Sequence, residues 1–296
     1  MTEIHPETPL LSLIVLSWDN LALTTACVDS LRRNTDVDYE LIVVDNGSTD
    51  GSREFSRDVS DVAVTNAENL GFAAGMNSGL RVSAGRYVAF INNDTTFPST
   101  WASQVLETFE SHEDVGIVAP AVTSAGNAVT VRDAPGHDRI VLTPFGELPS
   151  GVVYVMPREL INGLGGWNED YKTASSEDLD LAFTVWAHGY SIVVDERVLI
   201  EHESQASVRK LPDRKALYRE NLEQFLDRWK STPLGSSPLV GSIDPETFKA
   251  NQERAKTAVI WIRRVLEARE EARELAARLE SGSKPKKRRY WLITRS

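Results

Sequence analysis

Four clusters of polar residues could do chemistry, because each follows an apolar run of the kind that forms a buried strand. Burying amides and carboxylates costs several kcal/mol unless each group finds a partner. Strand ends that are rich in Asn and Asp therefore indicate a bound ligand. The four clusters are "SWDN" (17–20), "VVDNGSTDGS" (43–52), "NLGFAAGMNSGL" (69–80) and "INNDTTF" (91–97).

The last of these clusters, Asn92-Asn93-Asp94, could form half of a metal site. A carboxylate beside hydrogen-bonding amides suits Mg²⁺ or Mn²⁺, which take one or two protein ligands together with phosphate oxygens and waters. The alternative is a turn that the Asn and Asp side chains cap. Considered alone, these residues leave both interpretations open.

The stretch "VVDNGSTDGS" could bind an anion or a sugar. Gly47 and Gly51 allow a tight turn whose amides face a ligand, and Asp45 can accept hydrogen bonds from a ribose or a base edge. The alternative is a helix start that Ser48, Thr49 or Asp50 caps. The dinucleotide pattern G-x-G-x-x-G is absent after the first two strands.

Three glycines and two asparagines in 69–80, among them Asn69, Gly71 and Asn77, suggest that the backbone approaches a ligand closely. The alternative is helix packing through small residues.

Further acidic residues and a histidine lie in the second half of the chain. In "SSEDLDLAF", Glu177 and Asp178 stand at a helix start, where they could supply a general base or could merely complement the helix dipole. In "LIEHE", His202 ends a strand and is a candidate metal ligand, although a single histidine is more often structural.

A parallel sheet must position these residues. Continuous apolar strands separated by helical patterns predict an α/β fold covered on both faces, with ligands at the carboxyl ends of the strands. We expect strands at 11–18, 40–45, 61–67, 86–92 and 115–122, and helices at 21–35, 52–59, 73–84 and 99–112.

The regular alternation of strand and helix patterns ends after about residue 125. The small polar stretch 124–138 predicts a loop or irregular hairpin, and a strand with a short helix follows from 151. We expect a helix from about Glu177 to His188 with Gly189 as its C-cap, a strand to about Val194, and an amphipathic helix over 213–231.

The pattern predicts a main domain over 1–231, a linker over 232–243 and a C-terminal extension over 244–296. A long helix over 244–281 either packs on the main domain or mediates self-association. The basic tail 284–296 carries the pair Tyr290-Trp291, so it is either solvated or in contact with an anionic membrane surface.

Composition narrows the class of protein. A net charge of −11 argues against nucleic-acid binding, which needs a basic face. The single cysteine, Cys27, excludes an internal disulfide and a cysteine-based zinc cluster. No apolar run is long enough for a membrane span and the start has no basic signal region, so we expect a cytoplasmic protein, peripheral at a membrane if the tail binds one.

In this order and spacing, the clusters resemble the family 2 glycosyltransferases with the GT-A fold, a mixed and mainly parallel sheet with helices on both faces. The resemblance runs over about 11–229 and rests on "VVDNGSTDGS", "NLGFAAGMNSGL", "FINNDTTF", "GGWNEDY", "SEDLDLAF" and "LIEH". It is nearest to the bacterial rhamnosyl- and galactofuranosyltransferases of cell-surface glycan synthesis.

The resemblance implies roles for particular residues. Asp94 would bind the metal, His202 would complete that site, and Asn93 would lie near the ribose. The family usually has D-x-D at this turn, and Asn92 stands where the first Asp is expected. Asp178 would be the catalytic base with Glu177 beside it. For the donor, Asp45 would contact the nucleoside and Ser17 and Asp19 would line the base pocket, while Trp167 would lie in the wall of the acceptor or donor site.

The implied activity is metal-assisted, inverting transfer from a nucleoside-diphosphate sugar to a hydroxyl of a glycan or lipid-linked acceptor. By resemblance, dTDP-rhamnose is the first donor to expect and a UDP-sugar the second. The rival hypotheses are a sugar nucleotidyltransferase and a catalytically weak scaffold. The position after the first strand argues against the nucleotidyltransferase, because "SWDNLAL" holds no basic residue.

Overall fold

Residues of the first strand alternate between two hydrophobic cores, as the period of a β-strand requires. Leu13 and Val15 belong to one core and Ile14 to the other, and all three side chains are fully buried. The sheet therefore has no solvent-exposed face along this strand. Its strands are β1 (Leu11–Ser17), β2 (Tyr39–Asn46), β3 (Val62–Asn66), β4 (Tyr87–Asn92), β5 (Thr95–Thr96), β6 (Val115–Val122), β7 (Arg139–Leu142), β8 (Val153–Pro157) and β9 (Ser191–His202).

The computed structural model describes residues 8–111, 114–123, 135–142, 149–173, 175–203, 214–232 and 234. They fall within one unit, Met1–Gly235, whereas the unit Ser236–Ser296 contains no described residue. The predicted helix over 244–281, the basic tail and most of the predicted linker thus lie outside the described residues.

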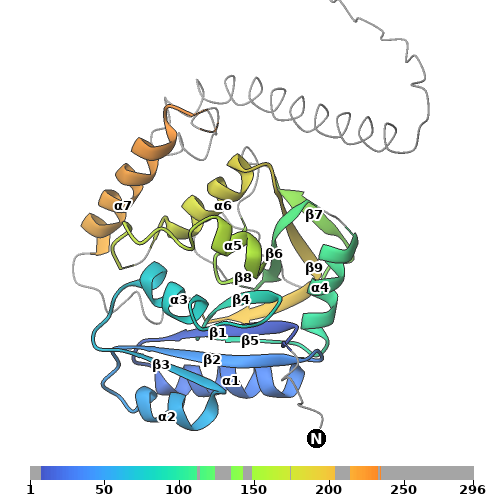
Figure 1. Cartoon of the computed structure of the whole chain (residues 1–296), viewed down its shortest axis with the longest axis vertical. Coiled ribbons are helices and arrows are strands. Elements are labelled where there is room, and N and C mark those ends of the chain that lie inside the picture. Colours follow the sequence, from blue (N-terminus) through green and yellow to red (C-terminus); the bar gives the residue numbers. More distant parts are fainter. Residues whose placement is uncertain are drawn as a thin grey trace, which may run out of the picture. The chain divides into compact units, whose positions relative to one another are not determined.

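The strand order is β3-β2-β1-β4-β8-β6-β9-β5, with β7 beside β9 (Figure 1). Four ladders are parallel: β1 with β2, β1 with β4, β2 with β3 and β6 with β9. Strand β8 runs antiparallel between β4 and β6, and β5 and β7 run antiparallel to β9. The predicted mixed α/β sheet, mainly parallel over its long ladders, is confirmed.

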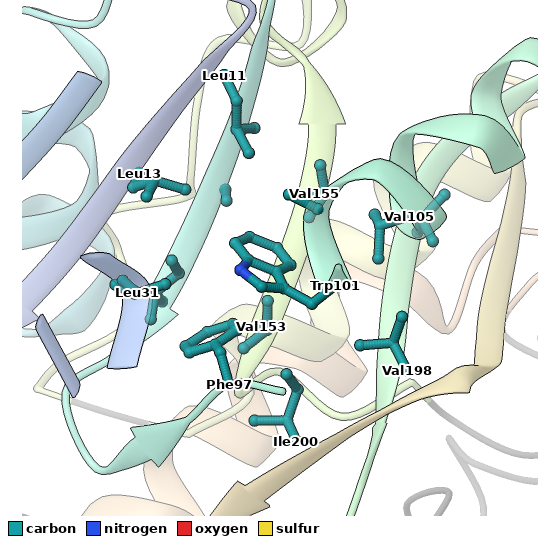
Figure 2. Packing of buried hydrophobic residues seen from close by; sticks show 14 of the residues in the cluster. Leu11, Leu13, Leu31, Phe97, Trp101, Val105, Val153, Val155, Val198 and Ile200 are labelled. Atoms are coloured by element: carbon teal, nitrogen blue, oxygen red, sulfur yellow. The ribbon is translucent and has the colours of Figure 1, made fainter. Parts of the chain in front are cut away.

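Helices cover both faces of the sheet (Figure 1). The core that contains Leu13 is closed by the first, second and fourth helices, and the core that contains Ile14 by the third, fifth and sixth. In the first of these cores Trp101 is fully buried, and its ring lies 4.7 Å from that of Phe97 (Figure 2). The helices are α1 (Leu21–Asn34), α2 (Ser52–Val59), α3 (Phe72–Leu80), α4 (Trp101–Ser111), α5 (Arg158–Gly163), α6 (Glu177–Ala187) and α7 (Arg214–Trp229).

Strand β9 continues past the expected end near Val194 to His202. Its pairing with β6 shifts register between Pro120 and Ala121, where Asp195 gives way to Leu199 on the partner strand, as at a β-bulge. Arg197 folds back there and forms an ion pair of 2.7 Å with the buried Asp195. The charged residues interrupt the apolar run without ending the strand.

Helix α7 is held against α6 by a buried carboxylate. Asp180 is 1% exposed and accepts a hydrogen bond of 2.7 Å from Trp229 Nε1. Phe225 of α7 packs edge-on against Phe183 of α6, with ring centroids 5.0 Å apart. In the part of the chain that the structure describes, no helix is both long and apolar enough to cross a membrane.

Candidate active site

Three neighbouring strands end in polar residues along the same edge of the sheet. The parallel register places Ser17 opposite Asp45, and Leu16 opposite both Val44 and Asn92. The ends of β2, β1 and β4 therefore lie in one row, as the sequence predicted. This is the edge at which α/β sheets bind ligands.

Asp94 and His202, the two predicted metal ligands, meet beside this row. The short strand β5 pairs with the end of β9, so that Thr95 lies opposite His202, and Glu203 donates its backbone N–H to Asp94 O at 2.9 Å. His202 Nε2 lies 3.3 Å from Asp94 Oδ1, and both side chains are less than a tenth exposed. Residues more than a hundred positions apart in the sequence are thus brought into contact.

The chemistry of these side chains fits a divalent cation. Asp94 Oδ1 and Asn92 Oδ1 are buried and have no hydrogen-bond partner within the protein. An unpartnered buried oxygen costs about 1–3 kcal/mol, which a bound cation would offset. The described residues contain no group of three or more His, Cys, Asp and Glu side chains that could hold a metal. A cation here would therefore take few protein ligands and share others with a ligand's phosphates.

Helix α1 holds the turn after β4 in place through hydrogen bonds. Asn93 is buried and donates from Nδ2 to Thr24 Oγ1 at 2.8 Å, and that hydroxyl lies 2.9 Å from Ser17 Oγ. The Cys27 thiol lies 3.6 Å from Thr95 Oγ1, and burial raises its pKa to about 12. The amide nitrogen of Asn93 and the hydroxyl of Ser17 hold the turn in place, and their predicted roles at a nucleotide stay predictions.

The loop after β2 is tied to the loop after β1. Asp19 accepts a hydrogen bond of 2.7 Å from Thr49 N, and Asp50 accepts one of 2.9 Å from Leu21 N at the start of α1. Asp45 is fully buried and accepts hydrogen bonds from Ser48 N at 3.1 Å and from Arg53 Nε at 3.0 Å. The rigid turn is present, whereas none of Ser48, Thr49 and Asp50 is the N-cap of α2, since that position is Gly51 and no side chain caps the helix.

An asparagine that sequence reasoning missed organises the loop before α3. Asn46 is 2% exposed and donates from Nδ2 to Asn69 Oδ1 and to Gly71 O, each at 3.0 Å. Its Oδ1 accepts hydrogen bonds from Asn66 Nδ2 at 3.0 Å and from Leu70 N at 3.2 Å. The predicted ligand contacts of Asn69 and Gly71 stay predictions, and their observed contacts are to this network.

Asn77 and Trp167 form one unit. Asn77 donates from Nδ2 to Trp167 O and accepts from Trp167 N, both at 2.9 Å. The indole is 2% exposed and packs edge-on against Phe72 and Phe90, each 5.2 Å away, and roughly parallel to Tyr154 at 6.0 Å. The structure gives the ring a core environment, and its predicted place in a sugar-binding wall stays a prediction.

Glu177 and Asp178 begin α6 in an environment that disfavours ionisation. Burial, and then the charge of Asp178, raise the pKa of Glu177 to about 8, and burial also raises that of Asp178. Glu177 Oε2 is buried without a hydrogen-bond partner. The pair therefore shares a proton readily near neutral pH, which suits a general base.

Asp178 lies against the residues before β8, at the same edge of the sheet. A Cβ atom on Gly151 would lie 2.5 Å from Asp178 Oδ2, so only glycine allows this approach without a shift. The next residue, Val152, accepts the backbone N–H of Asn92 at 3.0 Å. The carboxylate pair and the Asn92–Asp94 turn thus border a common stretch of backbone.

Sequence reasoning missed Arg53 and Gly151 as well as Asn46. Asn46 lies within the predicted turn and Arg53 directly follows it, so both could have been found from the sequence. Gly151 carried no signal, because the antiparallel pairing of β8 with β4 brings the residues before β8 to this edge.

The fold is that of the GT-A glycosyltransferases. The mannosyltransferase PcManGT from Pyrobaculum calidifontis, solved with GDP-Man and Mn²⁺, has a TM-score of 0.58 at 20% identity, covering 93% of this chain and 81% of that one. Staphylococcus aureus TarS 1–349 with UDP-GlcNAc has a TM-score of 0.60 at 15% identity, covering 84% and 79%.

Residues 12–151 match the family model of glycosyl transferase family 2. The uncharacterized glycosyltransferase EpsJ of Bacillus subtilis (strain 168) is 29% identical over 109 residues, which cover 36% of this chain and 32% of EpsJ. The matched region spans about a third or less of the length of the first curated relatives. Together with the fold, these matches support a family 2 glycosyltransferase.

Proposed function

We propose that the chain is an inverting glycosyltransferase that moves a sugar from a nucleoside-diphosphate sugar to a hydroxyl of a glycan or lipid-linked acceptor. One observation carries the proposal. Among the described residues, the buried amide and carboxylate oxygens without a hydrogen-bond partner are those of Asn92, Asp94 and Glu177. All three border the sheet edge where such donors would bind.

A divalent cation is part of the proposal, with Asp94 and His202 as the residues that would hold it. When bound, it would neutralise negative charge that develops on the departing diphosphate. Mn²⁺ accompanies the nucleotide sugar in the PcManGT structure, and His202 as a nitrogen ligand favours Mn²⁺ over Mg²⁺.

Other residues of the chain would bind the nucleoside and act as the general base. The turn between β2 and α2 offers backbone amides and the Asp45–Arg53 pair to the nucleoside. Asp178 takes the proton from the acceptor hydroxyl, which attacks the anomeric carbon from the face opposite the leaving group. Burial and the charge of Asp178 raise the pKa of Glu177 to about 8, so Glu177 holds a proton at neutral pH. General-base help of this kind is worth about 10²- to 10⁴-fold.

The donor is proposed as dTDP-rhamnose or a UDP-sugar, and a panel of nucleotide sugars tests this directly. Thermal shifts with dTDP-, UDP- and GDP-sugars in Mn²⁺ identify the donor, because a ligand that binds only the native state raises its stability. Product analysis with that donor should then show release of the nucleoside diphosphate. Release of pyrophosphate from a sugar phosphate and a nucleoside triphosphate would instead establish a nucleotidyltransferase.

The Asp178→Asn variant tests the proposed base. It should lose most transfer, by about 10²-fold or more, and keep its affinity for the nucleoside diphosphate. Transfer near the wild-type rate would show that Asp178 is not the base.

A further inference from the structure

The segment that leads into α6 has an unusual backbone. Thr173, Ser175 and Ser176 have φ angles of +60°, +93° and +70°. L-residues other than glycine rarely adopt this left-handed conformation, and such residues persist only where surrounding contacts impose it. Ser176 immediately precedes Glu177 and Asp178, so the conformation of this segment sets where the carboxylate pair lies.

A buried side chain of α7 imposes the conformation from one side. Asn221 is fully buried, and its Nδ2 donates to Lys172 O at 2.9 Å and to Ser175 O at 3.1 Å. Its Oδ1 accepts the Lys172 N–H at 3.2 Å. One amide side chain thus bridges both ends of the left-handed segment.

The start of α3 holds the same segment from the opposite side. Thr173 O accepts the backbone N–H of Phe72 at 2.6 Å. Gly71 has a φ of +87°, and a Cβ atom on it would lie 3.0 Å from Thr173 Cα and N. These left-handed residues are therefore fixed between two elements that lie about 50 and about 100 residues away in the chain.

We propose that Asn221 is a positioning residue for transfer: by fixing the segment 172–176, it keeps Asp178 in place at the sheet edge. This assignment rests on the proposed function, in which Asp178 is the base. A residue with a purely structural role would affect the unfolding temperature alone. A positioning residue also affects the rate of transfer in the folded protein, while donor binding at the ends of β1, β2 and β4 stays unchanged.

The test compares Asn221→Ala and Asn221→Asp with Trp229→Phe. The last variant is a matched control, because Trp229 also lies on α7 and makes one buried hydrogen bond, to Asp180, without contacting the segment. For each variant, kcat with the donor found by the nucleotide-sugar panel is measured well below its unfolding temperature, along with the Kd for the nucleoside diphosphate. Hydrogen exchange of the amides in 172–180 reports the order of the segment.

Both Asn221 variants should lower kcat at least tenfold, change Kd less than twofold and speed exchange in 172–180, whereas Trp229→Phe should keep wild-type kcat. Equal kcat in all variants, or a parallel loss in the Asn221 variants and Trp229→Phe, would overturn the positioning role and leave the proposed function standing. A wild-type protein that transfers from none of the nucleotide sugars would overturn both.

Discussion

At the scale of single residues, the site is defined by buried polar atoms that the protein itself does not satisfy. Asp94 Oδ1 lies in contact distance of one histidine nitrogen and accepts no hydrogen bond, whereas the buried Asp45 accepts two. Folded proteins rarely leave such atoms without partners. The hydrogen bonds of Asp45 therefore fix its own loop, whereas Asp94 Oδ1 has no hydrogen bond within the protein.

Replacing Asp94 should weaken ligand binding without lowering the stability of the metal-free protein. Asp94→Asn removes the charge of a buried carboxylate whose Oδ1 accepts no hydrogen bond, so the protein without metal should unfold at the same temperature or be stabilised by about 1 kcal/mol. The same variant should lose the rise in unfolding temperature that Mn²⁺ and a nucleoside diphosphate give the wild type. Thermal unfolding with and without the ligands measures both. A full ligand-induced rise in the variant would remove Asp94 from the metal site.

Glu177 predicts how stability depends on pH. Its pKa rises from an ordinary value of 4.5 to about 8 on folding, first through burial and then through the charge of Asp178. The folded state therefore binds this proton more tightly, so the contribution is fully present below about pH 4.5 and is lost as pH rises through about 8. Glu177→Gln should gain stability relative to the wild type between pH 5 and pH 8, by about 3–4 kcal/mol.

Chemical unfolding at several pH values checks this prediction. Glu159→Gln is the matched control, because Glu159 is an exposed residue in the first turn of α5. A stability difference between Glu177→Gln and the wild type that stays constant from pH 5 to pH 8 would show that Glu177 titrates normally.

At the scale of elements, the short connections around β8 decide where Asp178, the proposed catalytic base, lies. Gly151 precedes β8 and touches Asp178 at the start of α6, and Val152 bonds to the end of β4. Because strand β8 runs antiparallel to β4, its beginning rather than its end lies at the ligand-binding edge. An antiparallel strand inserted into a parallel sheet thus contributes its N-terminal side to the site.

Gly151→Ala should impair transfer without unfolding the protein. The added Cβ would lie 2.5 Å from Asp178 Oδ2 and 2.6 Å from its Cβ, so the carboxylate must move. We expect kcat to fall at least tenfold, since misplacement by about 1 Å can cost about 10²-fold, with unchanged affinity for the nucleoside diphosphate. Gly163→Ala provides the control, because nothing lies within 4 Å of its added Cβ. Equal kcat in the two variants would contradict this placement of Asp178.

The sequence predicted the elements well where one local pattern decides them. The strand over 115–122 and the helix over 52–59 match the structure to the residue. The third helix ends at Leu80 rather than at 84, where Ser83 Oγ instead bonds to Leu80 O. The strand order and the antiparallel insertion of β8 could not be predicted from the sequence, because they depend on pairing between strands that are far apart in the chain.

The candidate site could be predicted where polar residues end a strand, as for the contact between Asp94 and His202, whose role at a metal stays a prediction. It was missed where contacts depend on tertiary packing. Asn221 is an asparagine in an amphipathic helical pattern, and only the docking of α7 shows that it holds the backbone before Asp178. The left-handed residues Ser175 and Ser176 are also invisible in the sequence, where they read as helix caps.

At the scale of the whole molecule, α7 joins the region after β9 to the active-site side of the sheet. Asp180, which is 1% exposed, accepts hydrogen bonds from Trp229 Nε1 and from Asn168 Nδ2 and pairs with the partly exposed Arg228 at 3.2 Å. A buried carboxylate that loses a donor keeps its desolvation cost. The docking of α7 therefore depends on this small polar cluster as well as on Phe225.

Removing one donor tests that dependence. Trp229→Phe should lower the free energy of unfolding by about 1–3 kcal/mol, because Asp180 then keeps a buried oxygen without its indole partner. Urea unfolding measures the change, and Lys230→Ala, an exposed change one residue further along the chain, is the control. An equally small effect for both variants would show that the hydrogen bond contributes little to stability.

The central claim is that the edge formed by Asp45, Asp94 and His202 binds a nucleoside diphosphate together with a divalent cation. Titration calorimetry of UDP and dTDP, in Mn²⁺ and again in EDTA, with the wild type and Asp94→Asn, tests it most directly. We predict binding of at least one nucleotide by the wild type in Mn²⁺, weakened at least tenfold by EDTA and by Asp94→Asn alike. Binding of equal strength under all of these conditions, or no binding of either nucleotide in Mn²⁺, would contradict it.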